Sequence, residues 1–178
     1  NLSNSMLQFF DGKPSMVFGG DHLYLRYWNY VTLDWTIETI DPSPGVGSYA
    51  SLVRDGYGHT FISYYDSINQ VLKFATPSDN ILFPGWNIET LDPTPNSGIG
   101  NDIAVLTGGQ PQVSYTTYSS FAYRIKYVKR TCTGSFPHIV CSWSPPEEVA
   151  VGIYDGAGTS IAIASDGTPH ISFVTATL

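Results

Sequence analysis

The sequence repeats itself, and this repetition constrains the fold more than any other feature. A glycine precedes each of four similar apolar runs, GKPSMVF, GHTFISYYD, GQPQVSYTT and GTPHISFVT. These glycines are Gly12, Gly58, Gly109 and Gly167, so successive copies are 46, 51 and 58 residues apart. Self-similarity at this spacing predicts one supersecondary unit per copy, which buries its apolar surface against its neighbours.

Each copy divides into short alternating runs separated by Gly, Asp or Asn, a pattern that predicts antiparallel strands joined by tight turns. Three tryptophans mark the same place in successive copies: Trp35, Trp86 and Trp143. The first two open the related segments WTIETID and WNIETLD. Residues 1–178 are therefore interpreted as one domain, with repeats at approximately 5–41, 49–92, 101–151 and, as a partial copy, 159–178.

Four strands in a repeat of about 45 to 55 residues are the signature of a β-propeller blade. The runs with the smallest side chains, at 51–53, 103–105 and 161–163, are predicted to lie innermost, and the Trp-led runs outermost. The predicted fold class is an all-β propeller of four-stranded antiparallel blades, with about 3.5 blades per chain. Two chains that complete each other's half blades would close a seven-bladed ring, about twice 3.5 blades. A fragment of a longer repeat protein is the other interpretation.

Composition argues against two classes of partner. Lys and Arg number 8 against 15 Asp and Glu, and the net charge is −7. No basic stripe is left to neutralise phosphates, so nucleic acids and anionic membranes are not expected partners. No apolar run approaches the roughly 20 residues of a membrane span, so membrane insertion is not expected either.

The two cysteines, Cys132 and Cys141, flank a segment that must turn because it contains Gly134 and Pro137. This spacing predicts a disulfide across a long hairpin loop. Free thiols, or a metal site that includes His138, are the alternatives. A disulfide implies an oxidising compartment, so the protein is expected to be secreted or displayed at the cell surface.

The units resemble the repeats of bacterial and archaeal extracellular proteins, which read approximately SLALDSxGxPHISYYDxxNxxLKYA followed by WxIETVDxxG. Those repeats are related in fold to sialidase-like and Asp-box propellers. The similarity is closest at 51–75 and 86–92 and covers most of the chain, with a departure at 116–121 and in the cysteine loop. The resemblance implies a propeller in a secreted or surface setting and carries no catalytic residues.

Propeller ligands usually lie over the central channel, on the face made by the loops between second and third strands and by the blade-to-blade connections. Tyrosines with nearby Asp and Asn side chains are expected there, a combination that sugar or peptide binding uses. Each of them is also an ordinary turn or packing residue in its own right. The candidate ligand-binding residues are Tyr49, Tyr65, Asp66, Asn69, Asp92, Asp102, Tyr118 and Tyr154.

A catalytic function would need a set of active-site residues that the sequence does not place near one another. A sialidase-like hydrolase requires an arginine cluster together with an acid and a nucleophile. Arg26 aligns by spacing with Lys73 and Lys126, which indicates a structural position. Glu38 and Glu89 recur in the outer strand and are interpreted as solvated edge charges that discourage strand pairing. No catalytic residue is assigned.

The sequence therefore predicts a non-catalytic, secreted or surface module that binds carbohydrate or protein through the propeller face. The alternative is a glycan-processing, sialidase-like hydrolase whose site is completed by another chain or by sequence outside this one. No cofactor is expected; the Asp-containing loops at 66–69 and 101–102 offer oxygen ligands to a structural calcium ion, although neither has EF-hand spacing. The expected partners are a second copy of the chain, as a homodimer, and a carbohydrate or protein ligand.

Overall fold

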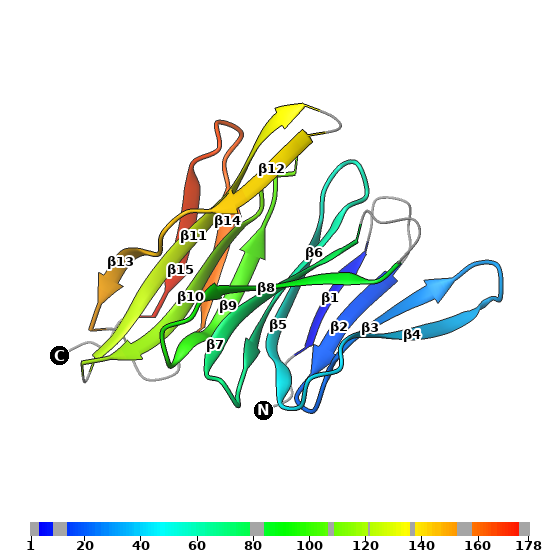
Figure 1. Ribbon diagram of the computed structural model, residues 1–178, viewed down its shortest axis with the longest axis horizontal. Coiled ribbons are helices and arrows are strands. Elements are labelled where there is room, and N and C mark those ends of the chain that lie inside the picture. The colour runs from blue at the N-terminus through cyan, green and yellow to red at the C-terminus, as the bar shows by residue number, and fades with distance from the viewer. Residues whose placement is uncertain are drawn as a thin grey trace.

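The computed structural model shows a chain built from antiparallel β-sheets (Figure 1). It describes residues 4–8, 14–78, 84–106, 109–120, 122–135, 138–152 and 158–174. Within these ranges the chain forms no helix, and so none that could cross a membrane. The prediction of an all-β fold with antiparallel sheets is confirmed.

The first two sheets are four-stranded meanders in which every strand pairs with its neighbour in the chain. The strands of the first sheet are β1 (Asn4–Gln8), β2 (Pro14–Gly19), β3 (Leu23–Asn29) and β4 (Asp34–Asp41). Those of the second are β5 (Val46–Arg54), β6 (Thr60–Asp66), β7 (Val71–Pro77) and β8 (Trp86–Asp92). The Trp-led segments thus form the last strand of each meander, as predicted for the outer position.

The third sheet is larger because its third strand is long. Its strands are β9 (Ser97–Ala104), β10 (Gln112–Ser119), β11 (Ala122–Ser135), β12 (His138–Trp143) and β13 (Glu147–Val151). β11 pairs with β13 along its first half and with β12 along its second. The predicted disulfide is confirmed: Cys132 and Cys141 face each other across the β11–β12 hairpin and are bonded. A fourth sheet contains β14 (Thr159–Ile163) and β15 (Pro169–Phe173).

The sheets follow one another side by side, with their first strands in contact. β5 lies against both β1 and β9, and β9 lies against β14. In Figure 1 the first sheet lies at one side of the molecule and the fourth at the other, and the described strands do not close into a ring. The arrangement is that of successive antiparallel sheets along an open arc.

The apolar core lies between the sheets, because a sheet can bury its faces only by packing against its neighbours. Val17 and Leu23 of the first sheet pack with Leu52 and Ile62 of the second. A second cluster joins the second sheet to the third through residues that include Phe74. All seven residues of β6 are buried, whereas β2 alternates between buried and half-buried positions. The second sheet is therefore covered on both sides by its neighbours.

The strand register corrects one equivalence drawn from spacing. Lys73 pairs with Tyr64 and Lys126 with Tyr115, but in the first sheet the matching partner of Phe18 is Tyr24 rather than Arg26. Register follows the turn length and the alternation of buried side chains, which counting along the sequence does not measure. The Arg26 guanidinium instead lies 5.1 Å from the ring centroid of Trp35.

Candidate functional site

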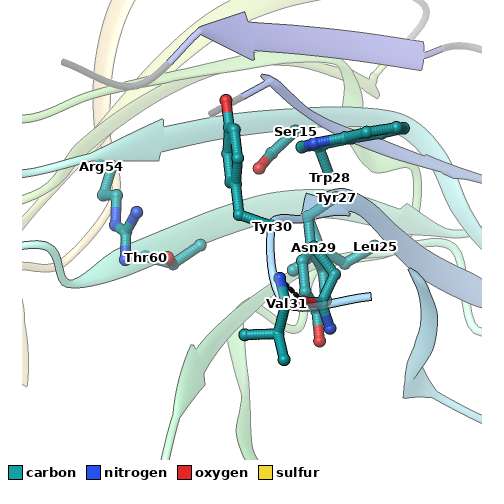
Figure 2. Close-up of a pocket in the computed structure, with 9 residues that line it drawn as sticks. All are labelled: Ser15, Leu25, Tyr27, Trp28, Asn29, Tyr30, Val31, Arg54 and Thr60. Atoms are coloured by element: carbon teal, nitrogen blue, oxygen red, sulfur yellow. Dashed lines mark hydrogen bonds between the residues drawn. The ribbon is translucent and has the colours of Figure 1, made fainter. Parts of the chain in front are cut away.

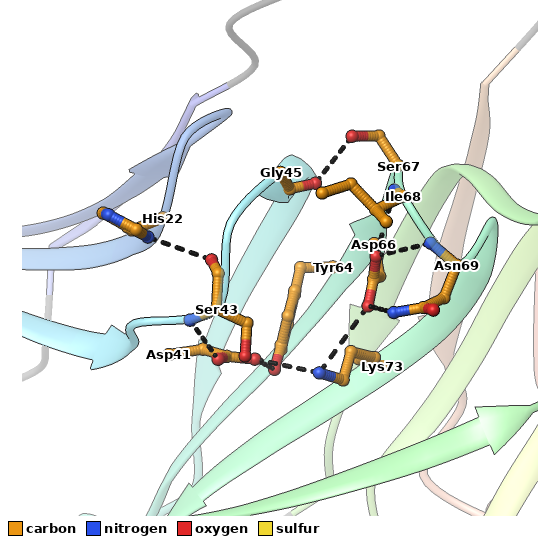
Figure 3. A network of polar contacts seen from close by, with 10 residues as sticks. All are labelled: His22, Asp41, Ser43, Gly45, Tyr64, Asp66, Ser67, Ile68, Asn69 and Lys73. Carbon is orange, nitrogen blue, oxygen red and sulfur yellow. Dashed lines mark hydrogen bonds and ion pairs between the residues drawn. The ribbon is translucent and has the colours of Figure 1, made fainter.

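On the predicted face, a buried polar network joins the first sheet to the second (Figure 3). Tyr64 Oη donates to Asp41 Oδ2 at 2.7 Å, and Lys73 Nζ donates to the same oxygen at 3.1 Å. Lys73 Nζ also lies 3.7 Å from Asp66 Oδ2. Burial raises the pKa of Asp41, but hydrogen bonds from Tyr64, Ser43 and Lys73 outweigh it and lower the pKa to about 2. Burial and the bond to Asp41 raise the pKa of Tyr64, so the phenol remains a donor.

The same cluster recurs between the second and third sheets. Tyr115 Oη donates to Asp92 Oδ2 at 2.7 Å, and Lys126 Nζ does so at 3.2 Å. Burial raises the pKa of Asp92, but hydrogen bonds from Thr94 and Tyr115 and the charge of Lys126 bring it below its usual value. We call these two groups the Asp–Tyr–Lys clusters. In each cluster the aspartate is the last residue of a Trp-led strand, and its carboxylate accepts hydrogen bonds from the next sheet. The carboxylate of Asp92 therefore joins two sheets.

Asp66 and Asn69 hold the turn between β6 and β7. Asp66 Oδ1 accepts the backbone N–H of Ile68 at 3.1 Å and of Asn69 at 2.9 Å, and its Oδ2 accepts the Asn69 side-chain amide at 2.8 Å. Asx-type bonds of this kind are the usual reason for Asp at the start of a turn. The structure therefore supplies a local role for both residues, and their part in ligand binding stays a prediction.

Asp102 links three first strands. Its Oδ1 accepts from Ser51 Oγ of β5 at 2.7 Å, and its Oδ2 accepts from Ser160 Oγ at 3.1 Å and from the backbone N–H of Ile161 at 3.0 Å, both in β14. Both carboxylate oxygens are thus engaged by neighbouring sheets.

The predicted tyrosines form local ring pairs in separate sheets. Tyr49 and Tyr65 lie with ring centroids 6.2 Å apart, and Tyr118 lies 4.7 Å from Tyr123. Tyr118 is partly exposed, at 37%. Tyr154 lies outside the described residues. None of the described candidates lines either of the two cavities described below.

A pocket of about 400 Å³ lies instead on the opposite face, between the first and second sheets (Figure 2). It is built by the β3–β4 and β5–β6 turns, which lie at the other end of the strands from the β2–β3 and β6–β7 turns. We call it the aromatic pocket. Its lining residues are Ser15, Leu25, Tyr27, Trp28, Asn29, Tyr30, Val31, Arg54 and Thr60.

The aromatic rings of this pocket are held by the turn that carries them. Asn29 Oδ1 accepts the backbone N–H of Val31 at 2.9 Å and of Thr32 at 3.3 Å. Trp28 packs edge-on against Tyr30 and Trp35, with centroids 6.4 and 5.7 Å apart. The Tyr30 side chain is half exposed and stands between Arg54 and Trp28 in Figure 2. An ordered aromatic platform beside amide, hydroxyl and guanidinium groups can bind a molecule that has both an apolar face and polar edges.

The sequence analysis did not predict this pocket, because it placed the ligand on the opposite face. The signal was present: the run Tyr27, Trp28, Asn29, Tyr30 places three aromatic side chains at a turn, where packing alone does not require them. A second cavity of about 490 Å³ lies on the same face, between the second and third sheets. We call it the disulfide groove. Its lining residues are Asp55, Tyr57, Gly58, His59, Phe61, Thr76, Pro77, Asn87, Gly109, Gln110, Arg130, Cys132 and Cys141.

The outer strands carry a further repeated contact, which corrects the interpretation of their glutamates. Trp86 Nε1 donates to Glu38 Oε1 at 2.7 Å, and Trp143 Nε1 donates to Glu89 Oε2 at 3.1 Å. Glu89 also pairs with Arg130 at 3.3 Å. These carboxylates are partly buried acceptors for the next sheet rather than solvated edge charges, because the indole of the following repeat reaches across to them.

Within the described residues no group of three or more His, Cys, Asp or Glu is placed to hold a metal ion. No family model matches the chain, and no curated protein matches it. Its fold is similar to that of a solved structure described as a bifunctional GH43-CE from Bacteroides eggerthii, with a TM-score of 0.51 and 13% sequence identity. The match covers 96% of this chain and 22% of that chain, so this chain spans less than a quarter of that protein. At this identity the likeness shows a common, propeller-like fold alone.

Proposed function

We propose that this chain is a non-catalytic carbohydrate-binding module of a secreted or surface protein, and that the aromatic pocket is its binding site. The observation that carries the proposal is the ring pair of a partly buried Trp28 and a half-exposed Tyr30, which the Asn29 turn holds beside a cavity. Sugar rings present C–H faces that pack on aromatic rings and hydroxyls that bond to polar neighbours. The structural neighbour belongs by its description to GH43, a glycoside hydrolase family, which is consistent with a carbohydrate-related fold.

The composition of the pocket favours binding over hydrolysis. Glycoside hydrolysis uses two carboxyl groups that flank the scissile bond. The residues that line the aromatic pocket, all within the described part of the chain, include no Asp or Glu. The alternative function, a hydrolase with a composite site, therefore requires its acids from outside this pocket.

Replacing Trp28 with alanine is expected to weaken carbohydrate binding about ten-fold or more, because loss of a buried aromatic contact costs roughly 1.5–3 kcal/mol. The measurement is calorimetric titration with cello-, xylo-, arabino- and chito-hexaose. Tyr30→Ala should also weaken binding, and because the Tyr30 ring is half exposed its loss should disturb folding less than the loss of Trp28. A loss of affinity in both variants therefore reports on binding rather than on folding. Tyr118→Ala is the matched control, since Tyr118 is an exposed aromatic near the opposite face and should leave the affinity unchanged.

The reverse pattern, with binding lost in Tyr118→Ala and kept in Trp28→Ala, would move the site to the face first predicted. Absence of binding to all four hexasaccharides would overturn the proposal. Release of shorter sugars from them would favour the hydrolase instead.

We also propose that the chain associates with a second copy to extend the arc towards a closed ring of about seven blades. Trp35 is equivalent by strand register to Trp86 and Trp143. Each of the three pairs with the corresponding residue of the preceding strand in its sheet, which is Trp28, Pro77 and Arg130 respectively. The indoles of Trp86 and Trp143 reach a glutamate of the preceding sheet, whereas no described residue accepts a hydrogen bond from Trp35 Nε1. The first sheet thus presents a side that, in the second and third sheets, contacts the preceding sheet.

Light scattering after size exclusion of the non-reduced chain is expected to give a mass near twice 19.5 kDa. A mass of one chain that persists as the protein concentration is raised would contradict this association. That result would leave the carbohydrate proposal untouched, because the aromatic pocket lies within one chain.

A further inference from the structure

The disulfide groove repeats the aromatic pocket one sheet further along the same face. Thr76 and Pro77 have the register positions of Tyr27 and Trp28: Pro77 pairs with Trp86 as Trp28 pairs with Trp35. Both pairs of residues line their respective cavities. The two cavities are therefore equivalent spaces between successive sheets, and each has a volume in the range of small-molecule sites.

The β5–β6 turn is the wall between the two cavities. Arg54 and Thr60, at its two ends, line the aromatic pocket, whereas Asp55, Tyr57 and His59 line the disulfide groove. A ligand that passes from one cavity to the other must cross this turn.

Hydrogen bonds within the turn hold it in one shape. Asp55, which is buried, accepts the backbone N–H of Tyr57 and of His59 at Oδ1, each at 2.9 Å, and contacts His59 Nδ1 at Oδ2, at 2.8 Å. Arg54 Nε donates to the Gly58 carbonyl at 2.6 Å. The backbone is bonded as well: the Asp55 N–H donates to the His59 carbonyl, and the Gly58 N–H donates to the Asp55 carbonyl. A turn tied at so many points pays little additional ordering cost when a ligand binds.

The side chain that this turn holds out is a large aromatic one. Tyr57 is 74% exposed, although it belongs to a well-bonded turn. Its ring lies 6.3 Å from that of His59, which lies 6.5 Å from Phe61, and Phe61 stacks on Phe74 at 6.0 Å. Tyr57 is thus the outer end of a row of rings that reaches the core between the second and third sheets.

The groove beyond Tyr57 is lined by polar groups suited to hydroxyls. Asn87, Gln110 and Arg130 face it together with His59. Arg130 is paired with Glu89, so the groove does not offer an uncompensated cation. This combination suits a neutral, hydroxyl-rich chain better than an anionic one.

We propose that the disulfide groove is a second subsite for the same ligand, and that this ligand is a linear oligosaccharide long enough to cross the β5–β6 turn, with one sugar ring stacked on Tyr57. This inference rests on the proposed carbohydrate-binding function. A single compact sugar occupies one cavity at a time, whereas a linear chain occupies both and packs on the exposed ring between them.

The test compares disaccharides and hexasaccharides of the cello, xylo, arabino and chito series by calorimetric titration. For the series that binds, the hexasaccharide is expected to bind at least about ten-fold more tightly than the disaccharide, since a second linked contact is made at high effective concentration. Tyr57→Ala should remove most of this gain and weaken the disaccharide by a much smaller factor than the hexasaccharide, because the disaccharide can still bind in the aromatic pocket. Tyr57→Phe, which keeps the ring, should retain the gain, and Trp28→Ala should weaken both ligands.

Equal affinity for disaccharide and hexasaccharide, or a length gain that persists in Tyr57→Ala, would overturn the second subsite while leaving the proposed function intact. Absence of binding at either length in all four series would overturn both. Tyr57 is largely exposed, so an unchanged melting temperature of Tyr57→Ala is expected and shows that the folded protein is being compared.

Discussion

Replacing Asp92 with alanine is expected to lower the free energy of unfolding by about 3–5 kcal/mol, the cost of breaking a buried ion pair from one side. The change leaves Lys126 Nζ and Tyr115 Oη without their shared acceptor, at a position where Asp92 is only 1% exposed. Water cannot readily replace the carboxylate there, so both groups remain desolvated and unpaired. Urea unfolding followed by tryptophan fluorescence measures the loss.

Two variants bracket this result. Tyr115→Phe removes only the hydroxyl and is expected to cost about 1.5–3 kcal/mol, the net value of one hydrogen bond to a charged group. Asp34→Ala removes an exposed carboxylate from the first residue of β4, where among the described residues it accepts only the backbone N–H of Trp35, and should cost less than about 1 kcal/mol. An Asp92→Ala chain that is as stable as Asp34→Ala would mean that the Asp–Tyr–Lys cluster does not hold the sheets together.

Gly98→Ala is expected to destabilise the protein by about 3–5 kcal/mol. Alanine would be strained at the positive φ of this position, and its methyl group would also crowd the neighbouring sheet. Gly98 has a φ of 109°, and an added Cβ would lie 2.8 Å from the Cα of Leu72 in the neighbouring sheet. Gly47 repeats the arrangement one sheet earlier, with a φ of 94° and an added Cβ 2.8 Å from the Cα of Gly19. In both places the obstacle is backbone, which cannot rotate away as a side chain can. Thermal or urea unfolding of each variant measures the effect.

Gly167→Ala separates strain from crowding in this prediction. Gly167 has a comparable φ of 89°, but an added Cβ there would meet no atom within 4 Å. Its substitution should therefore cost only the backbone term, about 1–2 kcal/mol. If Gly98→Ala and Gly167→Ala were equally destabilising, the close approach of the sheets would not contribute.

The contacts divide the two faces of the molecule between different tasks. The ends of the strands near Asp41 and Asp92 are tied from sheet to sheet by charge and hydrogen bonds, so the polar groups that resembled a binding site are already satisfied. At the opposite ends, aromatic side chains remain exposed beside cavities, as Tyr30 and Tyr57 do. The proposed ligand therefore belongs on the second face.

The sequence by itself determined the features that are encoded over short distances. The glycine before each apolar run and the alternation within it predicted the antiparallel strands, and the small residues of the first runs placed them together. The spacing of Cys132 and Cys141 around a turn predicted their bond, because cross-strand partners in a hairpin are set by the turn itself. These features need only a strand and its immediate neighbour.

Only the tertiary structure decided which polar side chains were free. Asp92 lies in a turn-like sequence, yet its acceptor oxygen is used by residues 23 and 34 positions later, in another sheet. The position equivalent to Lys73 is Tyr24 because strand register, rather than residue count, sets which side chains face one another. Glu38 likewise bonds to an indole 48 positions away. Such partners depend on how whole sheets pack, and packing is a long-range property that a local pattern of residues does not contain.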